Sequence, residues 1–313
     1  MPIATFDEVI QLATARPPIT VSVAAAHDVE VLKSIQHAMQ QGFVRPYLVG
    51  KALEIEQMML DLGMDFSGVQ VIPADSDEEA AYRAAALAND GTADCVMKGL
   101  INSSVFLRGI LNKDFQLRTD SLLSHVSIFE VPNFPRLLYL ADGGLNVAPD
   151  LQQKEQILRN TIGFLNRMGL ERPRVALLSA NETVMPGMPV TVEADILAQR
   201  ANEGAYGPAI VDGPLPLDLA ISPEAAQHKH IMPKTEGRAD LLFAPTIEVG
   251  NILGKAITYF GGGTMAGVVL GAKIPLVLTS RADSNRAKMV SLAFTVLEAA
   301  HRANTSPSKV GNL

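Results

Sequence analysis

Apolar and polar positions alternate in a regular way along most of this chain. Short runs rich in Val, Ile and Leu are typical of buried strands, and the longer amphipathic segments between them are typical of helices. The pattern predicts strands over residues 19–25, 47–49, 69–72, 93–97, 126–131, 137–140, 175–179, 209–211, 241–243, 268–270 and 275–279. It predicts helices over residues 28–41, 52–62, 77–89, 103–111, 151–169, 192–201, 252–260 and 283–301. This alternation indicates an α/β fold with mainly parallel sheets, covered by helices on both faces.

The chain has 313 residues, which is too long for one small core and suits two linked domains. We predict a discontinuous α/β domain I over residues 1–138 and 273–313, to which the last strand and helix return. An α/β domain II is predicted over residues 139–272. In folds of this kind, ligands bind outside the carboxyl ends of strands, often in an interdomain cleft. The loops that follow strands are therefore the segments to search for a site.

Composition and charge narrow the functional classes. Hydrophobic residues make up 48% of the chain and charged residues 19%, as in compact globular proteins. A net charge of -7 without a Lys/Arg block speaks against nucleic-acid binding, although an anionic ligand needs only a few local cations. We expect no signal peptide and no membrane span. The single cysteine, Cys95, is expected in the core, and its isolation fits a reducing, cytoplasmic compartment.

The loop after the fourth predicted strand carries a cation and two hydroxyls. Lys98 ends the strand, Ser103 and Ser104 open the next helix, and Arg108 lies one turn further on. The free N–H groups of a helix N-terminus suit a phosphate group, so these four residues form a candidate anion site. The alternative is ordinary helix capping by Asn102 or Ser103.

Aspartates also follow predicted strands in the middle of the chain. Asp142 precedes two glycines, and Asp212 precedes Gly213 and lies near Asp218. A tight turn is the simpler interpretation of each aspartate, and a binding site is the alternative. Because neither is accompanied by a histidine or a third carboxylate at metal-site spacing, we predict no metal site.

Residues 245–255 suggest a strand end, a loop and a helix start that contains Gly250, Asn251 and Lys255. The segment lacks the first glycine and the final hydroxyl of a P-loop, so ATP binding of that type is not expected. An anion or a carbonyl group can still bind where Gly250 and Asn251 open the helix. The nearby segment 261–267 is glycine-rich but follows a helix, so we interpret it as a turn rather than a dinucleotide-binding motif.

The last predicted strand is followed by Ser280, Arg281 and Asp283, which supply a hydroxyl, a permanent cation and a carboxylate within four residues. A guanidinium at a strand end is well suited to binding phosphate. The alternative is that Asp283 or Ser284 only caps the final helix.

Several of these segments, in this order, resemble motifs of the phosphate acetyltransferase/phosphate butyryltransferase family. They are residues 97–100 (MKGL), 124–126 (SHV), 141–149 (ADGGLNVAP), 211–224 (VDGPLPLDLAISPE), 245–255 (PTIEVGNILGK) and 278–281 (LTSR). The first three are closer to the butyryltransferase branch. The resemblance covers most of the chain beyond about residue 20, and the order of the motifs makes it specific.

The resemblance implies two α/β domains related to the isocitrate/isopropylmalate dehydrogenase fold, usually in a homodimer. It implies that coenzyme A (CoA) and an acyl phosphate meet directly, with no required cofactor or metal. The substrates and products are then acyl-CoA, inorganic phosphate and acyl phosphate. Arg108 and Arg281 occupy the positions expected to hold the phosphate, and Ser280 is expected beside the thioester carbonyl. Lys98, Ser103 and Ser104 are predicted to bind substrate because they form the candidate anion site. Within the matching motifs, we also predict substrate binding by Asp212, Gly250, Asn251 and Lys255.

Two residues depart from the pattern of acetyltransferase members. Tyr259 stands where they usually have an arginine, and Ala287 stands where they have the aspartate proposed as the base for the CoA thiol. Asp283 is the nearest substitute for that base. Two alternative functions therefore stay open at this point. One is an NAD- and metal-dependent dehydrogenase of the related fold, and the other is a non-catalytic sensor of acyl-CoA or acyl phosphate.

Overall fold

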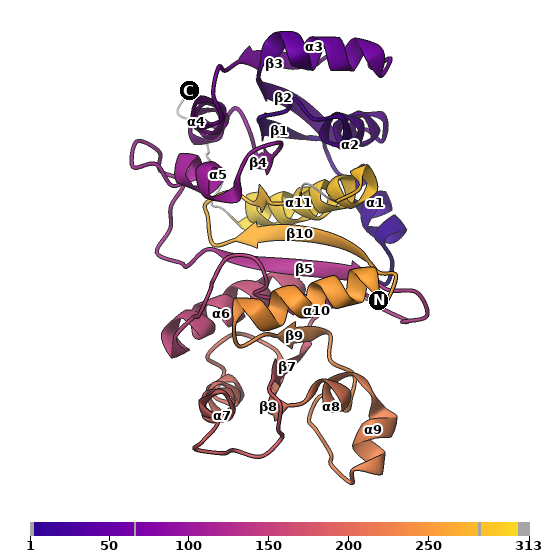
Figure 1. The fold of residues 1–313 in the computed structure, drawn as a ribbon, viewed down its shortest axis with the longest axis vertical. Helices are drawn as coiled ribbons and strands as arrows, with labels where there is room; N and C mark the ends of the chain where they lie inside the picture. The colour runs from indigo at the N-terminus through magenta and orange to yellow at the C-terminus, as the bar shows by residue number, and fades with distance from the viewer. Residues whose placement is uncertain (1–2, 66, 281–282, 306–313) are drawn as a thin grey trace. The chain divides into compact units, whose positions relative to one another are not determined.

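The structure, a computed structural model, describes residues 3–65, 67–280 and 283–305 (Figure 1). The chain forms two compact units, each described by itself below. The central unit consists of Met1–Thr5 and Asp120–Gly271, and the flanking unit consists of Phe6–Thr119 and Ala272–Leu313. In this division, residues 120–138 pack with the middle of the chain rather than with its start, because the strand that they contain pairs with two strands of the central unit.

The flanking unit contains a parallel sheet with the strand order β3-β2-β1-β4-β11. Its strands are β1 (Ile19–Ala24), β2 (Val44–Gly50), β3 (Gln70–Pro73), β4 (Cys95–Lys98) and β11 (Leu276–Val277). Its helices are α1 (Phe6–Thr14), α2 (Val29–Gln40), α3 (Ala52–Asp61), α4 (Asp77–Asn89), α5 (Ser103–Ile110) and α11 (Asn285–Thr305). The helix α1 was not among the predicted elements, although Phe6, Val9 and Ala13 form a buried face at helical spacing.

Alanine and glycine bring α4 and α5 close together in the flanking unit. α4 buries a face made entirely of alanines, which allows a neighbouring helix to approach closely. A Cβ atom on Gly109 of α5 would lie 2.6 Å from the Cβ atom of Ala81, so only glycine fits at this crossing. α11 instead packs against α1 and α2 and lies over β11 and β4. These contacts fix the start of α5 and the start of α11, where the predicted site residues lie.

The central unit contains a mixed sheet with the strand order β10-β5-β6-β9-β7-β8. Its strands are β5 (Ser124–Glu130), β6 (Leu138–Ala141), β7 (Arg174–Leu178), β8 (Ile210–Leu215), β9 (Leu241–Phe243) and β10 (Thr264–Leu270). Its helices are α6 (Leu151–Arg167), α7 (Pro189–Asn202), α8 (Leu217–Ile221), α9 (Pro223–His228) and α10 (Ile247–Tyr259). β5 is antiparallel to both β10 and β6, whereas β6, β9, β7 and β8 are parallel. The predicted adjacent pair of strands around residues 132–135 is confirmed as β5 and β6.

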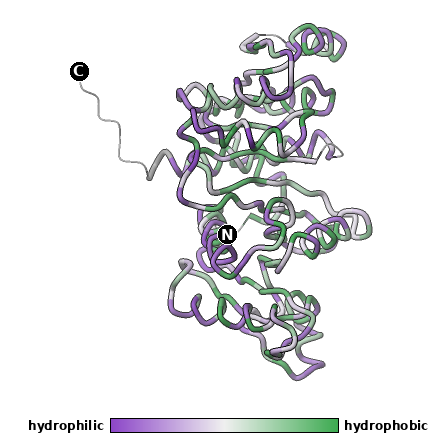
Figure 2. The backbone as a smooth tube through the Cα atoms, turned by 60° about the vertical axis from the view of Figure 1, so that its left-hand side comes forward, coloured by the Kyte–Doolittle hydropathy of each residue, from purple (hydrophilic) through white to green (hydrophobic). Residues whose placement is uncertain are grey.

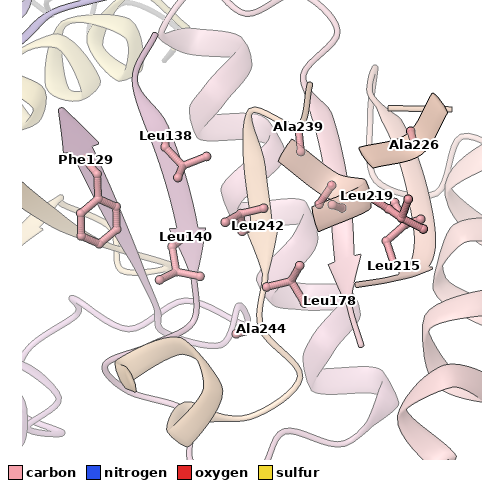
Figure 3. Close-up of a cluster of buried hydrophobic side chains, with 12 residues drawn as sticks. Phe129, Leu138, Leu140, Leu178, Leu215, Leu219, Ala226, Ala239, Leu242 and Ala244 are labelled. Atoms are coloured by element: carbon pink, nitrogen blue, oxygen red, sulfur yellow. The ribbon is translucent and has the colours of Figure 1, made fainter. Parts of the chain in front are cut away.

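One face of the central sheet buries a continuous apolar cluster (Figure 3). Alternate residues of each strand contribute to it, as Leu138 and Leu140 do on β6, because side chains on a strand point to opposite faces in turn. Short helices α8 and α9 close the cluster through Leu219 and Ala226, and α10 packs against it through Leu253 and Ile257. Full burial of one such leucine stabilises the fold by about 1.5–3 kcal/mol. Figure 2 shows the corresponding alternation of hydrophobic and hydrophilic segments along the backbone.

Two strands of the central unit are longer than predicted. β8 continues through the Asp-Gly-Pro segment to Leu215, which pairs with Leu178 after a register shift in β7. β10 already begins at Thr264, which pairs with Glu130, so the glycine-rich turn is shorter than expected. In both cases pairing with a neighbouring strand overrides the local turn signal of glycine and proline. Within the described ranges, no helix has the length and apolarity required to cross a bilayer.

Candidate functional site

The carboxyl ends of β1, β4 and β11 meet at one edge of the flanking sheet, because these strands are parallel and adjacent. Lys98 ends β4, opposite Ala24 of β1, and its side chain is buried with only 4% of the residue exposed. Its ammonium nitrogen Nζ lies 3.4 Å from the carbonyl oxygen of Thr279, to which it donates a hydrogen bond. The structure therefore brings the predicted cation Lys98 to the loop that carries Ser280.

Gly99 allows this arrangement, since the chain after Lys98 runs directly against the end of β1. The N–H groups of Gly99 and Leu100 donate to the carbonyl oxygens of Ala24 and Ala25, each at 2.8 Å. A Cβ atom at position 99 would lie 2.2 Å from the Ala25 carbonyl oxygen. Any larger residue would push the loop and Lys98 away from the strand ends.

Thr279 adds a second polar group beside Lys98. Its hydroxyl is buried and has no hydrogen-bond partner among the described residues, and only 3% of the residue is exposed. A buried hydroxyl without a partner costs about 1–3 kcal/mol. A polar ligand or a water molecule that accepted or donated a hydrogen bond here would remove this cost.

The predicted residues Ser280 and Asp283 lie together in the loop between β11 and α11. The backbone N–H of Ser280 donates to the Asp283 carboxylate at 2.7 Å, and the Asp283 N–H donates to the Ser280 carbonyl at 3.2 Å. The Asp283 carboxylate thus closes the loop before α11, whereas the helix is capped by the Ser284 hydroxyl, which accepts from the Ala287 N–H at 3.2 Å. Arg281 lies outside the described residues.

The other predicted residues of the flanking unit are on α5. Ser103 and Ser104 form its first turn, as predicted, and Arg108 lies in its last turn. Ser103 is half-buried, whereas Ser104 and Arg108 are exposed to solvent. All three residues therefore lie on the helix that follows the end of β4. This helix, α5, packs against α4.

In the central unit, Asp142 organises the turn after β6. The residue is 3% exposed, and its carboxylate accepts hydrogen bonds from the backbone N–H groups of His125, Gly144 and Leu145 at 3.0, 2.8 and 2.9 Å. The side-chain amide of Asn146 donates to the same carboxylate at 2.6 Å. Four donors are sufficient to stabilise an ionised carboxylate away from water. Asp142 therefore holds the turn after β6 together, a role that the weak turn signal in the sequence did not indicate.

The turn after β6 also contacts the start of α10. A Cβ atom on Gly143 would lie 2.9 Å from the carbonyl carbon of Gly250, and the Asn251 side-chain amide donates to the Gly143 carbonyl at 3.2 Å. Two segments that the sequence singled out separately, residues 142–144 and 250–251, are thus in direct backbone contact. Both glycines are required for this approach.

Asp212 and Lys255 lie apart from this contact. Asp212 lies within β8, not after it, and β8 is separated from β6 by β9 and β7. Its carboxylate accepts hydrogen bonds from the backbone N–H groups of Gly213 and Lys234, at 3.0 and 2.6 Å. Lys255 is exposed on α10. The expectation that Asp212 directly follows a strand is wrong because pairing with β7 extends β8.

Lys288 is a residue that the sequence did not single out. It lies in the first turns of α11, is 2% exposed, and its ammonium donates to the carbonyl oxygen of Asp283. Burial lowers the pKa of Lys288, while the neighbouring carboxylates of Asp283, Asp28 and Glu30 counteract this shift. Burial of a lysine depends on tertiary contacts with α2, so local sequence gives no signal for it.

Cys95 is fully buried in β4, and burial raises the pKa of its thiol, which suits a core residue rather than a nucleophile. Among the described residues, no group of three or more His, Cys, Asp and Glu side chains is arranged to hold a metal ion.

The central unit has a small apolar pocket between the sheet and the helices α6 and α7. Its empty volume is about 210 Å³, open solvent included, and Leu178, Phe243 and Leu197 are among the lining residues. The buried ammonium of Lys154, paired with Glu193, forms part of its wall. None of the site residues that the sequence predicts lines this pocket.

Comparison with known proteins gives consistent results. The family model described as phosphate acetyl/butaryl transferase matches residues 75–296. The chain is 39% identical to the phosphate butyryltransferase of Clostridium acetobutylicum over 96% of its length and all of the relative's length. It is 38% identical to the phosphate acetyltransferase of Thermotoga maritima, over 88% of this chain and 94% of that one.

Solved structures agree with this result. A branched-chain phosphotransacylase from Enterococcus faecalis V583 superposes with a TM-score of 0.81 at 32% identity, over 90% of this chain and 99% of that one. The 4-hydroxythreonine-4-phosphate dehydrogenase of Klebsiella pneumoniae superposes with a TM-score of 0.50 at 17% identity, over 91% and 99% of the two chains. The second likeness concerns the fold alone, and it confirms the predicted α/β class with a dehydrogenase-like relative. The family match and the sequence identities together show that this chain belongs to the phosphate acetyl/butyryl transferase family.

Proposed function

We propose that this protein is an acyltransferase that moves a short acyl group, acetyl or butyryl, between CoA and inorganic phosphate by direct attack in a ternary complex. Membership of the family and the names of its relatives support this function. The structural observation that carries the proposal is the position of Lys98. Its buried ammonium contacts the carbonyl oxygen of Thr279, the residue directly before Ser280.

In the direction that forms acyl phosphate, a phosphate oxygen attacks the thioester carbonyl carbon and the CoA thiolate leaves. The carbonyl oxygen carries negative charge at the tetrahedral stage. In our proposal the Ser280 hydroxyl lies beside that oxygen and donates a hydrogen bond to it. One well-oriented donor of this kind lowers the activation free energy by about 3 kcal/mol. Arg281 and Arg108 bind and orient the phosphate, and Lys98, Ser103 and Ser104 add a cation and hydroxyl donors on the same strand end. The buried cation of Lys98 acts in a weakly screened environment, which strengthens its effect on an anion.

In the reverse direction, the CoA thiol must lose its proton to attack the acyl phosphate, because its ordinary pKa is about 8.5. Ala287 is buried, with 4% of the residue exposed, and its methyl side chain cannot act as a base. We assign the role of base to Asp283, whose carboxylate lies in the same loop as Ser280. Asp283→Asn tests this assignment, which requires a loss of rate in the CoA-acylating direction.

We propose that the central unit binds substrate through Gly250 and Asn251 at the start of α10. The close approach of Gly250 to Gly143 supports this, because it holds the exposed Asn251 against the turn after β6. Lys255 on α10 adds an exposed cation for the phosphates of CoA. Asp212 contributes by holding residue 234 against β8 through its backbone hydrogen bond.

The decisive experiment is a thiol-release assay with acetyl-, propionyl- and butyryl-CoA, with and without inorganic phosphate. The proposal expects release of CoA only when phosphate is present, and the preferred acyl-CoA identifies the natural acyl length. Binding of acyl-CoA without turnover would instead support the sensor, and NAD-dependent oxidation would support the dehydrogenase. The family match favours neither alternative.

Variants at the loop test the residue roles. Ser280→Ala and Arg281→Ala should each lower kcat/KM by about 100-fold or more, as loss of one transition-state donor does. Arg83→Ala is the matched control, since Arg83 is paired with Glu79 on the surface of α4. A folded Arg281→Ala protein with the rate of the control would reject the assignment.

Three further properties are part of the proposal. CoA is a substrate and no cofactor or metal is required, so dialysis against EDTA should leave the rate unchanged. The protein acts in the cytoplasm as a homodimer. Light scattering during size-exclusion chromatography tests the homodimer directly.

A further inference from the structure

Lys288 is a charged residue in a place where charged residues are rarely found. It is 2% exposed, and a fully buried lysine is uncommon unless it is paired. The reaction proposed above assigns it no part. The free-energy cost of burying its ammonium must therefore be offset by interactions with the surrounding residues.

The partners of Lys288 come from two segments of the flanking unit. Its ammonium donates to the backbone carbonyl oxygen of Asp283, and its own N–H donates to the Ser284 carbonyl at 3.1 Å. The carboxylates of Asp283, Asp28 and Glu30 favour its charged form and raise its pKa against the effect of burial, the last two from the start of α2. The buried cation thus adds positive charge near three acidic side chains, of which Glu30 also pairs with Lys33.

The same loop is held at both of its described ends. At the first end, the Ser280 N–H donates to the Asp283 carboxylate at 2.7 Å. At the second end, the backbone N–H and the side-chain amide of Asn285 donate to one carboxylate oxygen of Glu30, at 3.1 and 3.0 Å. Lys288 holds the Asp283 residue of the first attachment, because its ammonium donates to the Asp283 carbonyl. Its ammonium therefore joins the loop to the first turns of α11, and the bonds between Asn285 and Glu30 join the start of α11 to α2.

We propose that Lys288 is a positioning residue for acyl transfer, which fixes Ser280 by holding the Asp283 backbone. This inference rests on the proposed function. A displacement of about 1 Å in a substrate-positioning group can lower a rate by about 100-fold. Without the ammonium, the Asp283 carbonyl loses its donor, and the Asp283 carboxylate that holds the Ser280 N–H is less firmly placed.

The test compares Lys288→Met, which keeps the length of the side chain without its charge, with Lys288→Arg, which keeps the charge. Lys51→Met is the matched control, because Lys51 is a half-exposed lysine of the same unit that pairs with Glu54. We expect Lys288→Met to be folded by circular dichroism, with kcat lowered by about tenfold or more and KM for phosphate and CoA changed by less than about threefold. Lys288→Arg should recover at least a third of the lost kcat, which a purely structural role does not require.

A folded Lys288→Met protein with kcat within about twofold of the wild type overturns the inference. If this variant does not fold, Lys288→Gln is measured in its place and judged by the same limit. Loss of folding in both variants would assign Lys288 a purely structural role and also overturn the inference. Failure of the proposed function is distinguishable, because the wild-type protein itself would then show no phosphate-dependent release of thiol.

Discussion

Gly143 and Gly250 are in backbone contact, and this contact joins the turn after β6 to the first turn of α10. A Cβ atom on Gly250 would lie 2.7 Å from the Gly143 Cα atom and 2.8 Å from the Asp142 carbonyl oxygen. These neighbours are backbone atoms, which have little freedom to shift. The position of Asn251, which donates to the Gly143 carbonyl, therefore depends on the absence of a side chain at residue 250.

Gly250→Ala should destabilise the protein and reduce its activity. Overpacking against backbone atoms costs about 1–3 kcal/mol, and the displaced α10 start would carry Asn251 with it. Denaturant unfolding measures the first effect, and the thiol-release assay measures the second through KM for CoA. Gly187→Ala is the control, because a Cβ atom there meets nothing within 4 Å. Equal stability of the two variants would show that the contact tolerates a methyl group.

Asp142→Asn should also destabilise the protein, by about 2–3 kcal/mol. The carboxylate accepts three backbone hydrogen bonds and one from Asn146, whereas an amide at this position turns one acceptor into a donor. At least one buried N–H group then loses its partner. The free energy of unfolding in urea, measured at pH 7, tests the size of the effect.

The control for this prediction is Asp195→Asn, at a surface position of α7 where the carboxylate accepts from Gln199. It should change the free energy of unfolding by less than about 0.5 kcal/mol. A loss no greater than that in Asp142→Asn would mean that the turn after β6 does not depend on the charge of Asp142.

Much of the fold was predictable because its strands are short apolar runs and its helices have clear ends. The pattern failed where the deciding partner lies elsewhere in the chain. β8 continues through Asp212 and Gly213 because β7 offers a bulged edge, and β10 starts at Thr264 because β5 offers Glu130. Local turn signals contain no information about these partners.

The candidate site was predictable to the extent that strand ends determine it. Parallel strands place their carboxyl ends at one edge, so the sequence could indicate that Lys98 and Ser280 would be neighbours. It could not indicate the burial of Lys288, which depends on how α11 packs against α2. The sequence also gave the same turn signal for Asp142 and Asp212. Only the turn that contains Asp142 contacts the start of α10.

The attachment of Glu30 to Asn285 should give the protein a measurable dependence on pH. Hydrogen bonds from Asn285 are the main cause that lowers the pKa of Glu30 below its ordinary value of about 4.3. Because the folded protein then binds fewer protons than the unfolded chain, the carboxylate stabilises the fold above the unfolded pKa. This contribution is lost as the pH falls through the lowered, folded pKa.

Glu30→Gln removes the charge and keeps an oxygen that accepts hydrogen bonds from Asn285. We expect the wild type to be more stable at pH 7 by about 0.5 kcal/mol, a small value because the carboxylate is half-exposed and screened by solvent. The difference in Tm should stay constant above about pH 5 and shrink as the pH falls through the lowered pKa of Glu30 in the folded protein. Thermal unfolding from pH 3 to pH 7 measures it, with Glu56→Gln on the exposed face of α3 as the control. A difference in Tm that is the same at pH 3 and at pH 7 would show that the charge of Glu30 does not hold the start of α11.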